Sequence, residues 1–96
     1  SIAGTLQYLK DGQVRNIPAG AFVPFEMEST YNRIGTVAVS DGGQFELRLR
    51  SEYRYDWMTD RVNLQYVEDG ITYIKTFTNL NTLNDFSGPI ILDPLQ

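Results

Sequence analysis

The sequence predicts an all-β domain built as a seven-strand antiparallel β-sandwich. Three observations carry this expectation. Short runs of residues alternate between apolar and polar with the period of a strand. Turn-forming Gly, Asp and Asn residues separate these runs at intervals of roughly 8–12 residues, the spacing typical of sandwiches. No segment of about ten or more residues shows the apolar stripe of an amphipathic helix.

The clearest run spans residues 35–49. Phe45, Leu47 and Leu49 alternate with polar residues, which indicates a strand with one buried face. The preceding run, residues 36–40, is short and largely β-branched. The Asp-Gly-Gly sequence at 41–43 supplies the positive φ angles that a tight turn needs. We therefore expect a β-hairpin here.

The other strands follow from the same alternation. We expect them at residues 1–10, 21–28, 62–66, 71–78 and 89–92. Residues 13–20 suit an irregular connection. Because proline donates no hydrogen bond, we expect the strand of Pro24 to lie at a sheet edge or to have that position facing away from its neighbour. Residues expected between the two layers of the sandwich are Phe25, Phe45, Leu47, Leu49, Leu64 and Tyr73.

The composition lowers the expectation of catalysis. The 96 residues contain no cysteine and no histidine, which removes the usual nucleophile, the usual neutral-pH base and the best zinc ligands. A net charge of −4 with scattered basic residues argues against a nucleic-acid surface. No apolar run approaches the roughly 18–20 residues of a membrane span. We expect no enzyme, no cofactor, no metal site, no nucleic-acid binding and no membrane insertion.

The length fits a single domain covering residues 1–96. The chain begins on a strand-like segment without Met and stops just after another, so we expect it to be one module of a larger protein.

Four short motifs occur in order along the chain: Gly4-Thr5-Leu6, residues 17–23, the Ser-Asp-Gly-Gly-Gln-Phe-Glu-Leu run at 40–47 and the tyrosine at 53. Together they resemble the transthyretin-like (prealbumin-like) sandwiches, and in particular the carboxypeptidase regulatory-like domains of bacterial surface proteins. The resemblance implies a seven-strand Ig-like sandwich without catalysis of its own, commonly an accessory or spacer module on the cell surface. It assigns no functional residue, because the matched positions are turn and core positions.

Three aromatic residues are candidate contacts for a ligand or partner: Phe22, Tyr31 and Trp57. Phe22 faces away from Val23 and Phe25, and an exposed phenylalanine beside a proline is typical of a docking patch. Trp57 continues the row of Tyr53 and Tyr55, which suits either sugar stacking or burial in the core, and burial is favoured for the two tyrosines.

The sequence gives less support to two further hypotheses, a Ca²⁺ site and an isopeptide bond. The loop at 79–88 carries Asn79, Asn81, Asn84 and Asp85, whose oxygens suit Ca²⁺, but it lacks a bidentate acid. An isopeptide bond between Lys10 and Asp93 would need both groups buried beside a protonated acid, and we expect Lys10 to be solvated.

The expected function is that of a non-catalytic structural or protein-interaction module in a larger extracellular, cell-surface or virion-associated protein. Its partners would be neighbouring domains of the same polypeptide or another protein. The alternative is a carbohydrate- or peptide-binding module that uses exposed aromatic side chains, with a glycan as a possible ligand.

Overall fold

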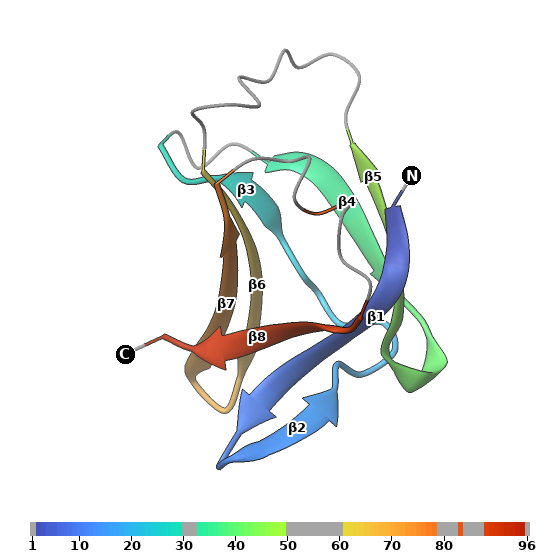
Figure 1. Cartoon of the computed structure of the whole chain (residues 1–96), viewed down its shortest axis with the longest axis vertical. Helices are drawn as coiled ribbons and strands as arrows, with labels where there is room; N and C mark the ends of the chain where they lie inside the picture. Colours follow the sequence, from blue (N-terminus) through green and yellow to red (C-terminus); the bar gives the residue numbers. More distant parts are fainter. Residues whose placement is uncertain (1, 30–32, 50–60, 79–82, 84–87, 96) are drawn as a thin grey trace.

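The computed structural model describes residues 2–29, 33–49, 61–78, 83 and 88–95, and Figure 1 draws the course of the chain. The strands are β1 (Ile2–Lys10), β2 (Gln13–Asn16), β3 (Phe25–Met27), β4 (Arg33–Val39), β5 (Gln44–Leu49), β6 (Val62–Glu68), β7 (Ile71–Phe77) and β8 (Ile90–Pro94), with a 3-10 turn, η1 (Asp41–Gly43), between β4 and β5.

Seven of these strands close into a barrel in the order β1-β5-β4-β3-β6-β7-β8. Strand β8 completes the closure because its beginning pairs with β1 and its end pairs with β7. Within the described residues, β1 and β8 form the one parallel pair, and Leu6 lies opposite Ile90. The expected antiparallel Ig-like (prealbumin-like) sandwich is therefore wrong, although the all-β class is confirmed.

The physical reason for this error is that the two architectures share one sequence pattern. A sandwich and a barrel both need strands with one buried and one exposed face, so alternation predicts either equally well. The difference lies in whether the edge strands pair with each other, and β8 is long enough to reach both edges. Closure removes the bare backbone groups that sandwich edges leave exposed.

The core lies inside the barrel and matches the expected set of residues. Phe25, Phe45, Leu47, Leu64 and Tyr73 are buried, and Leu49 is half-buried against the same cluster. Buried residues that complete the core are Leu6, Tyr8, Ile17, Val23, Ile34, Val39, Val62, Tyr66, Phe77, Leu83, Ile90 and Leu92.

A β-bulge brings Ile34 into this core. Phe25 lies opposite Gly35 and Glu26 lies opposite Arg33, so Ile34 is an additional residue in β4. The local bend lets Ile34 be fully buried. Gly35 beside it allows the close approach, since a Cβ there would lie 2.7 Å from the carbonyl oxygen of Arg48.

Two boundary predictions need correction. Residues 13–16, expected to be irregular, form β2 because they pair with the end of β1. Of the two arrangements expected for Pro24, the sheet edge is wrong, since β4 and β6 flank β3. Pro24 lies just before β3, and its carbonyl oxygen accepts a hydrogen bond from the Gln65 N–H at 3.2 Å. The proline thus joins the sheet through its one available group.

The predicted turn at residues 41–43 is confirmed. The β4–β5 hairpin turns through η1, where Gly42 and Gly43 both have positive φ. The β6–β7 hairpin turns at Asp69 and Gly70, also at positive φ. None of the helical residues among those described forms a stretch long and apolar enough to cross a membrane.

Candidate functional site

Phe22 lies on the outer surface, in the connection between β2 and β3. The Gly20 N–H donates to the Val39 carbonyl at 2.9 Å, which fixes this connection against the end of β4. Val23 and Phe25 are buried, and Phe22, in the opposite phase, is 66 % exposed. The outward orientation predicted from the alternation is therefore observed.

The face of the Phe22 ring is covered by the guanidinium of Arg33, which lies 4.8 Å from the ring centroid. The Nε atom of Arg33 lies 3.6 Å from a carboxylate oxygen of Glu26, its neighbour across the β3–β4 pair. The ion pair and the cation–π contact hold the guanidinium over the ring. We call these three residues the Phe22 surface.

The other two predicted contact residues, Tyr31 and Trp57, lie outside the described residues. The same holds for Tyr53, Tyr55 and the asparagines and aspartate of the 79–88 loop. Their proposed roles stay predictions. Sequence reasoning had no signal for Arg33 and Glu26, because the bulge in β4 sets which β4 residue lies beside Glu26.

A second group of side chains gathers where the β1–β2 and β6–β7 turns meet, and we call it the tyrosine cluster: Tyr8, Tyr66 and Tyr73. The Tyr8 ring centroid lies 5.1 Å from that of Tyr66 and 5.0 Å from that of Tyr73, both in edge-on geometry. The hydroxyls of Tyr8 and Tyr66 donate to the Glu68 carboxylate at 3.0 Å and 2.9 Å.

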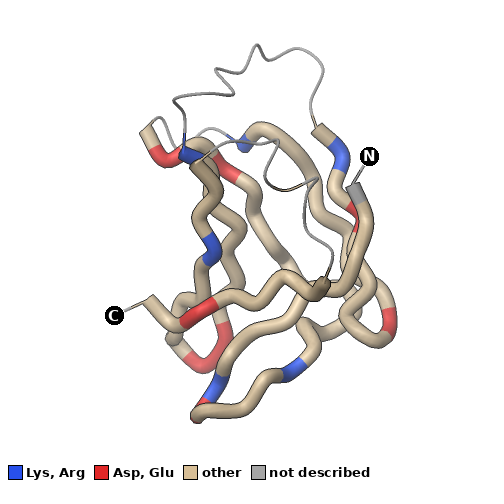
Figure 2. Tube along the Cα trace, in the orientation of Figure 1, with Lys and Arg blue, Asp and Glu red and all other residues tan. Residues whose placement is uncertain are grey.

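Lys10 completes this arrangement with two ion pairs. Its Nζ lies 2.7 Å from Glu68 and 2.8 Å from Asp69, and Figure 2 shows acidic and basic positions close together at this end of the barrel. The Lys10 side chain is 18 % exposed and is therefore partly solvated.

These contacts determine the protonation states of the tyrosine cluster and of its charged neighbours, Lys10 and Glu68. The hydrogen bonds that Lys10 donates to Asp69 and Glu68 raise the pKa of Lys10, so its amine stays charged and is not the neutral nucleophile that an isopeptide bond needs. Hydrogen bonds from Lys10 and Tyr66 lower the pKa of Glu68. Burial, reinforced by Glu68, raises the pKa of Tyr66 to about 12. The cluster is thus suited to joining strands rather than to proton transfer near neutral pH.

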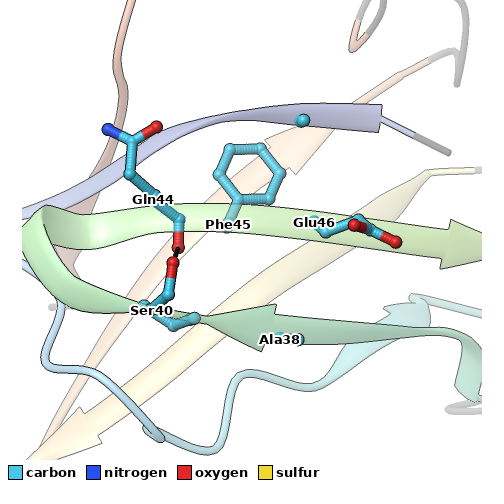
Figure 3. A pocket seen from close by; sticks show the side chains of 7 residues that line it. Ala38, Ser40, Gln44, Phe45 and Glu46 are labelled. Atoms are coloured by element: carbon cyan, nitrogen blue, oxygen red, sulfur yellow. Dashed lines mark hydrogen bonds between the residues drawn. The ribbon is translucent and has the colours of Figure 1, made fainter.

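The outer face of β1, β5 and β4 carries a shallow recess of about 410 Å³ (Figure 3). It forms because Ala3 and Ala38, both small, lie opposite Glu46 on its two sides. At its rim the Ser40 hydroxyl donates to the Gln44 carbonyl at 3.2 Å. One carboxylate without a histidine or a second acid offers neither a nucleophile–base pair nor a metal site.

Within the described part of the chain, no group of three or more His, Cys, Asp or Glu residues is placed to hold a metal ion. Comparison with protein families, with curated proteins and with solved structures finds no match. The resemblance to transthyretin-like domains therefore stays a prediction. The Phe22 surface combines an exposed aromatic ring with an arginine side chain.

Proposed function

We propose that the chain is a non-catalytic protein-interaction module that binds its partner through the Phe22 surface. The observation that carries the proposal is a phenylalanine ring 66 % exposed and already stacked under a guanidinium. Aromatic residues and arginine are enriched at the centres of protein interfaces. Covering the remaining ring area would contribute up to about 2 kcal/mol by the usual area relation.

The geometry of the Phe22 surface also favours binding because its side chains are already ordered before a partner binds. The ion pair with Glu26 and the ring of Phe22 restrain the long Arg33 side chain before any partner arrives. Pre-ordered side chains lose less conformational entropy on association. The partner surface that fits is an apolar groove for the ring with an acceptor for the guanidinium at its rim.

The test is photo-crosslinking from position 22. A benzophenone-bearing phenylalanine analogue replaces Phe22 in the full-length protein, and a matched variant carries it at Thr36, which is exposed on the outer face of β4. We expect one discrete protein adduct from position 22 and none from position 36. Excess wild-type protein competes for the adduct, whereas Phe22→Ala and Arg33→Ala proteins compete at least about tenfold less well.

Equal labelling from both positions, or competition by the Phe22→Ala protein as strong as by wild type, contradicts the proposal. A glycan panel distinguishes the alternative function, using the fluorescence of the single tryptophan as the readout. A fluorescence change on adding a glycan that disappears in Phe22→Ala would show that the Phe22 surface binds a carbohydrate and not a protein. Because Phe22 is exposed, Phe22→Ala should change the free energy of unfolding by no more than about 0.5 kcal/mol.

A further inference from the structure

Strand β2 presents an edge outside the closed barrel. It pairs with β1 and with no other described strand, and all four of its residues are exposed. Figure 1 shows it at one end of the molecule, beside the end of β1. β2 contains no proline and no other described strand pairs with its outer edge, so its unpaired backbone groups are a template for pairing with another strand.

The hydrogen-bonding direction of β2 follows from its turn. A two-residue turn at Asp11 and Gly12 makes Lys10 and Gln13 a hydrogen-bonded pair, and such pairs alternate along an antiparallel ladder. The Ile17 N–H indeed donates to the Leu6 carbonyl at 3.1 Å, which fits this alternation. Gln13 and Arg15 therefore bond to β1, and the backbone groups of Val14 and Asn16 point away from the barrel.

We propose that β2 pairs antiparallel with β2 of a second copy of this chain, about a two-fold axis through Val14. Outward backbone groups must pair with outward backbone groups, which allows axes through Gln13, Val14, Arg15 or Asn16. An axis through Arg15 would set the two guanidinium groups opposite each other, and an axis through Gln13 would set Val14 opposite Gly12, which has no side chain to cover it. An axis through Asn16 would set Val14 opposite Pro18, which has no N–H to donate. The axis through Val14 sets Val14 opposite Val14 of the second copy, with two reciprocal hydrogen bonds.

The side chains suit this register. The two valines, each 50 % exposed in the monomer, cover each other on one face of the continuous sheet. On the other face, Arg15 lies opposite Gln13 of the second copy, with Asp11 two residues further along that strand. The guanidinium otherwise has a described hydrogen bond only to Gln13 of its own strand, at 3.4 Å. The pairing therefore places each cation near the other copy's polar and acidic turn.

The length of β2 sets the strength of the dimer. A four-residue strand buries much less surface than the roughly 1,200–2,000 Å² of standard interfaces, so the dimer is weak and depends on concentration. Each copy also carries a net charge of −4, which adds repulsion that salt screens. This edge is separate from the Phe22 surface, and the two proposals stand or fall independently.

Sedimentation equilibrium between about 20 µM and about 2 mM, at an ionic strength of about 0.15 M, tests the dimer. We expect the wild-type protein to shift from monomer to dimer across this range. Val14→Pro removes an N–H that β1 does not use and should weaken the dimer at least about tenfold. The matched control Val14→Thr keeps the N–H and should dimerise within about threefold of wild type.

Two further measurements do not depend on the proline variant folding normally. Gln13→Glu should strengthen the dimer and Gln13→Lys should weaken it, because Arg15 of the other copy faces this position. The Val14 amide should exchange hydrogen rapidly in dilute solution and more slowly at high concentration, while the Arg15 amide is protected at both. A monomer throughout the range, or a Val14 amide insensitive to concentration, overturns the proposal.

Discussion

Two hairpins in this molecule have nearly the same turn and opposite surroundings. Residues 8–12 read Tyr-Leu-Lys-Asp-Gly, and residues 66–70 read Tyr-Val-Glu-Asp-Gly. The φ angles are 52° and 75° at Asp11 and Gly12, and 53° and 76° at Asp69 and Gly70. The β6–β7 hairpin forms barrel wall, whereas β2 lies wholly exposed outside the barrel. The turn is thus a local property, and the burial of the strand that follows it is not.

The strand after each turn explains the difference. Three residues after Gly70 comes Tyr73, which is 1 % exposed, and three residues after Gly12 comes Arg15, which is exposed. The first strand brings an aromatic ring to the interior, and the second brings a charge that must stay near water. Two turns of equal geometry are therefore followed by a strand with a buried face, β7, and by an exposed strand, β2.

The two hairpins also meet each other. The tyrosines that precede the turns, Tyr8 and Tyr66, lie with ring centroids 5.1 Å apart. The charged residues at equivalent positions, Lys10 and Glu68, form an ion pair at 2.7 Å. The one position at which the two five-residue sequences differ in charge thus supplies an ion pair between the hairpins.

The largest expected effect comes from the interior side of the comparison. Tyr73→Ala removes a buried ring that packs on Tyr8 and Tyr66, and should lower the free energy of unfolding by about 3–5 kcal/mol. Its matched control is Arg15→Ala at the equivalent exposed position, with a change within about 0.5 kcal/mol. Urea denaturation in dilute solution measures both, and similar losses would contradict the contrast between the hairpins.

A smaller effect concerns the contact between the hairpins. Tyr66→Phe removes the hydroxyl that donates to Glu68 at 2.9 Å and should lower the free energy of unfolding by about 1.5–3 kcal/mol. Because the native pKa of Tyr66 is raised to about 12, the folded state holds this proton more tightly than the unfolded chain. Stability is complete below the ordinary tyrosine value of 10.0 and declines as the pH rises towards about 12.

The readout is urea denaturation as a function of pH, repeated in a Glu68→Gln background. In Tyr66→Phe the alkaline decline should be shallower than in wild type. The loss from Tyr66→Phe should also shrink when Glu68 is already replaced, because the two groups interact directly. Additive losses would show that the hydroxyl acts through another contact.

The smallest effect should be equal in the two hairpins. Gly12→Ala and Gly70→Ala each place a Cβ at positive φ with no heavy atom within 4 Å, so only backbone strain counts, at about 1–2 kcal/mol. Thermal unfolding should give values that agree within about 0.5 kcal/mol. A markedly smaller loss for Gly12→Ala would mean that the β1–β2 hairpin opens without unfolding the barrel.

Prediction from sequence succeeded where the cause is local. The alternation at Phe45 and Leu47 identified a strand and its buried face, and the Asp-Gly-Gly sequence at 41–43 identified the β4–β5 hairpin. It failed where pairing, and not burial, makes the strand. β2 forms because residues 13–16 pair with the end of β1 although all four are exposed, and Ile34 is buried because β4 carries a bulge. Of the Phe22 surface, only Phe22 itself was visible, since Arg33 lies beside its ring in space.

By itself the sequence determined the all-β class, the turns and most of the core, because periodicity and turn chemistry act over a few residues. Only the tertiary structure decided that the sheet closes into a barrel, through the parallel pairing of the first and last described strands. It alone brought Lys10 to Glu68 and left one edge of β2 bare. The reason is that strand partners far apart in the chain are selected by the packing of the whole core, which no local pattern records.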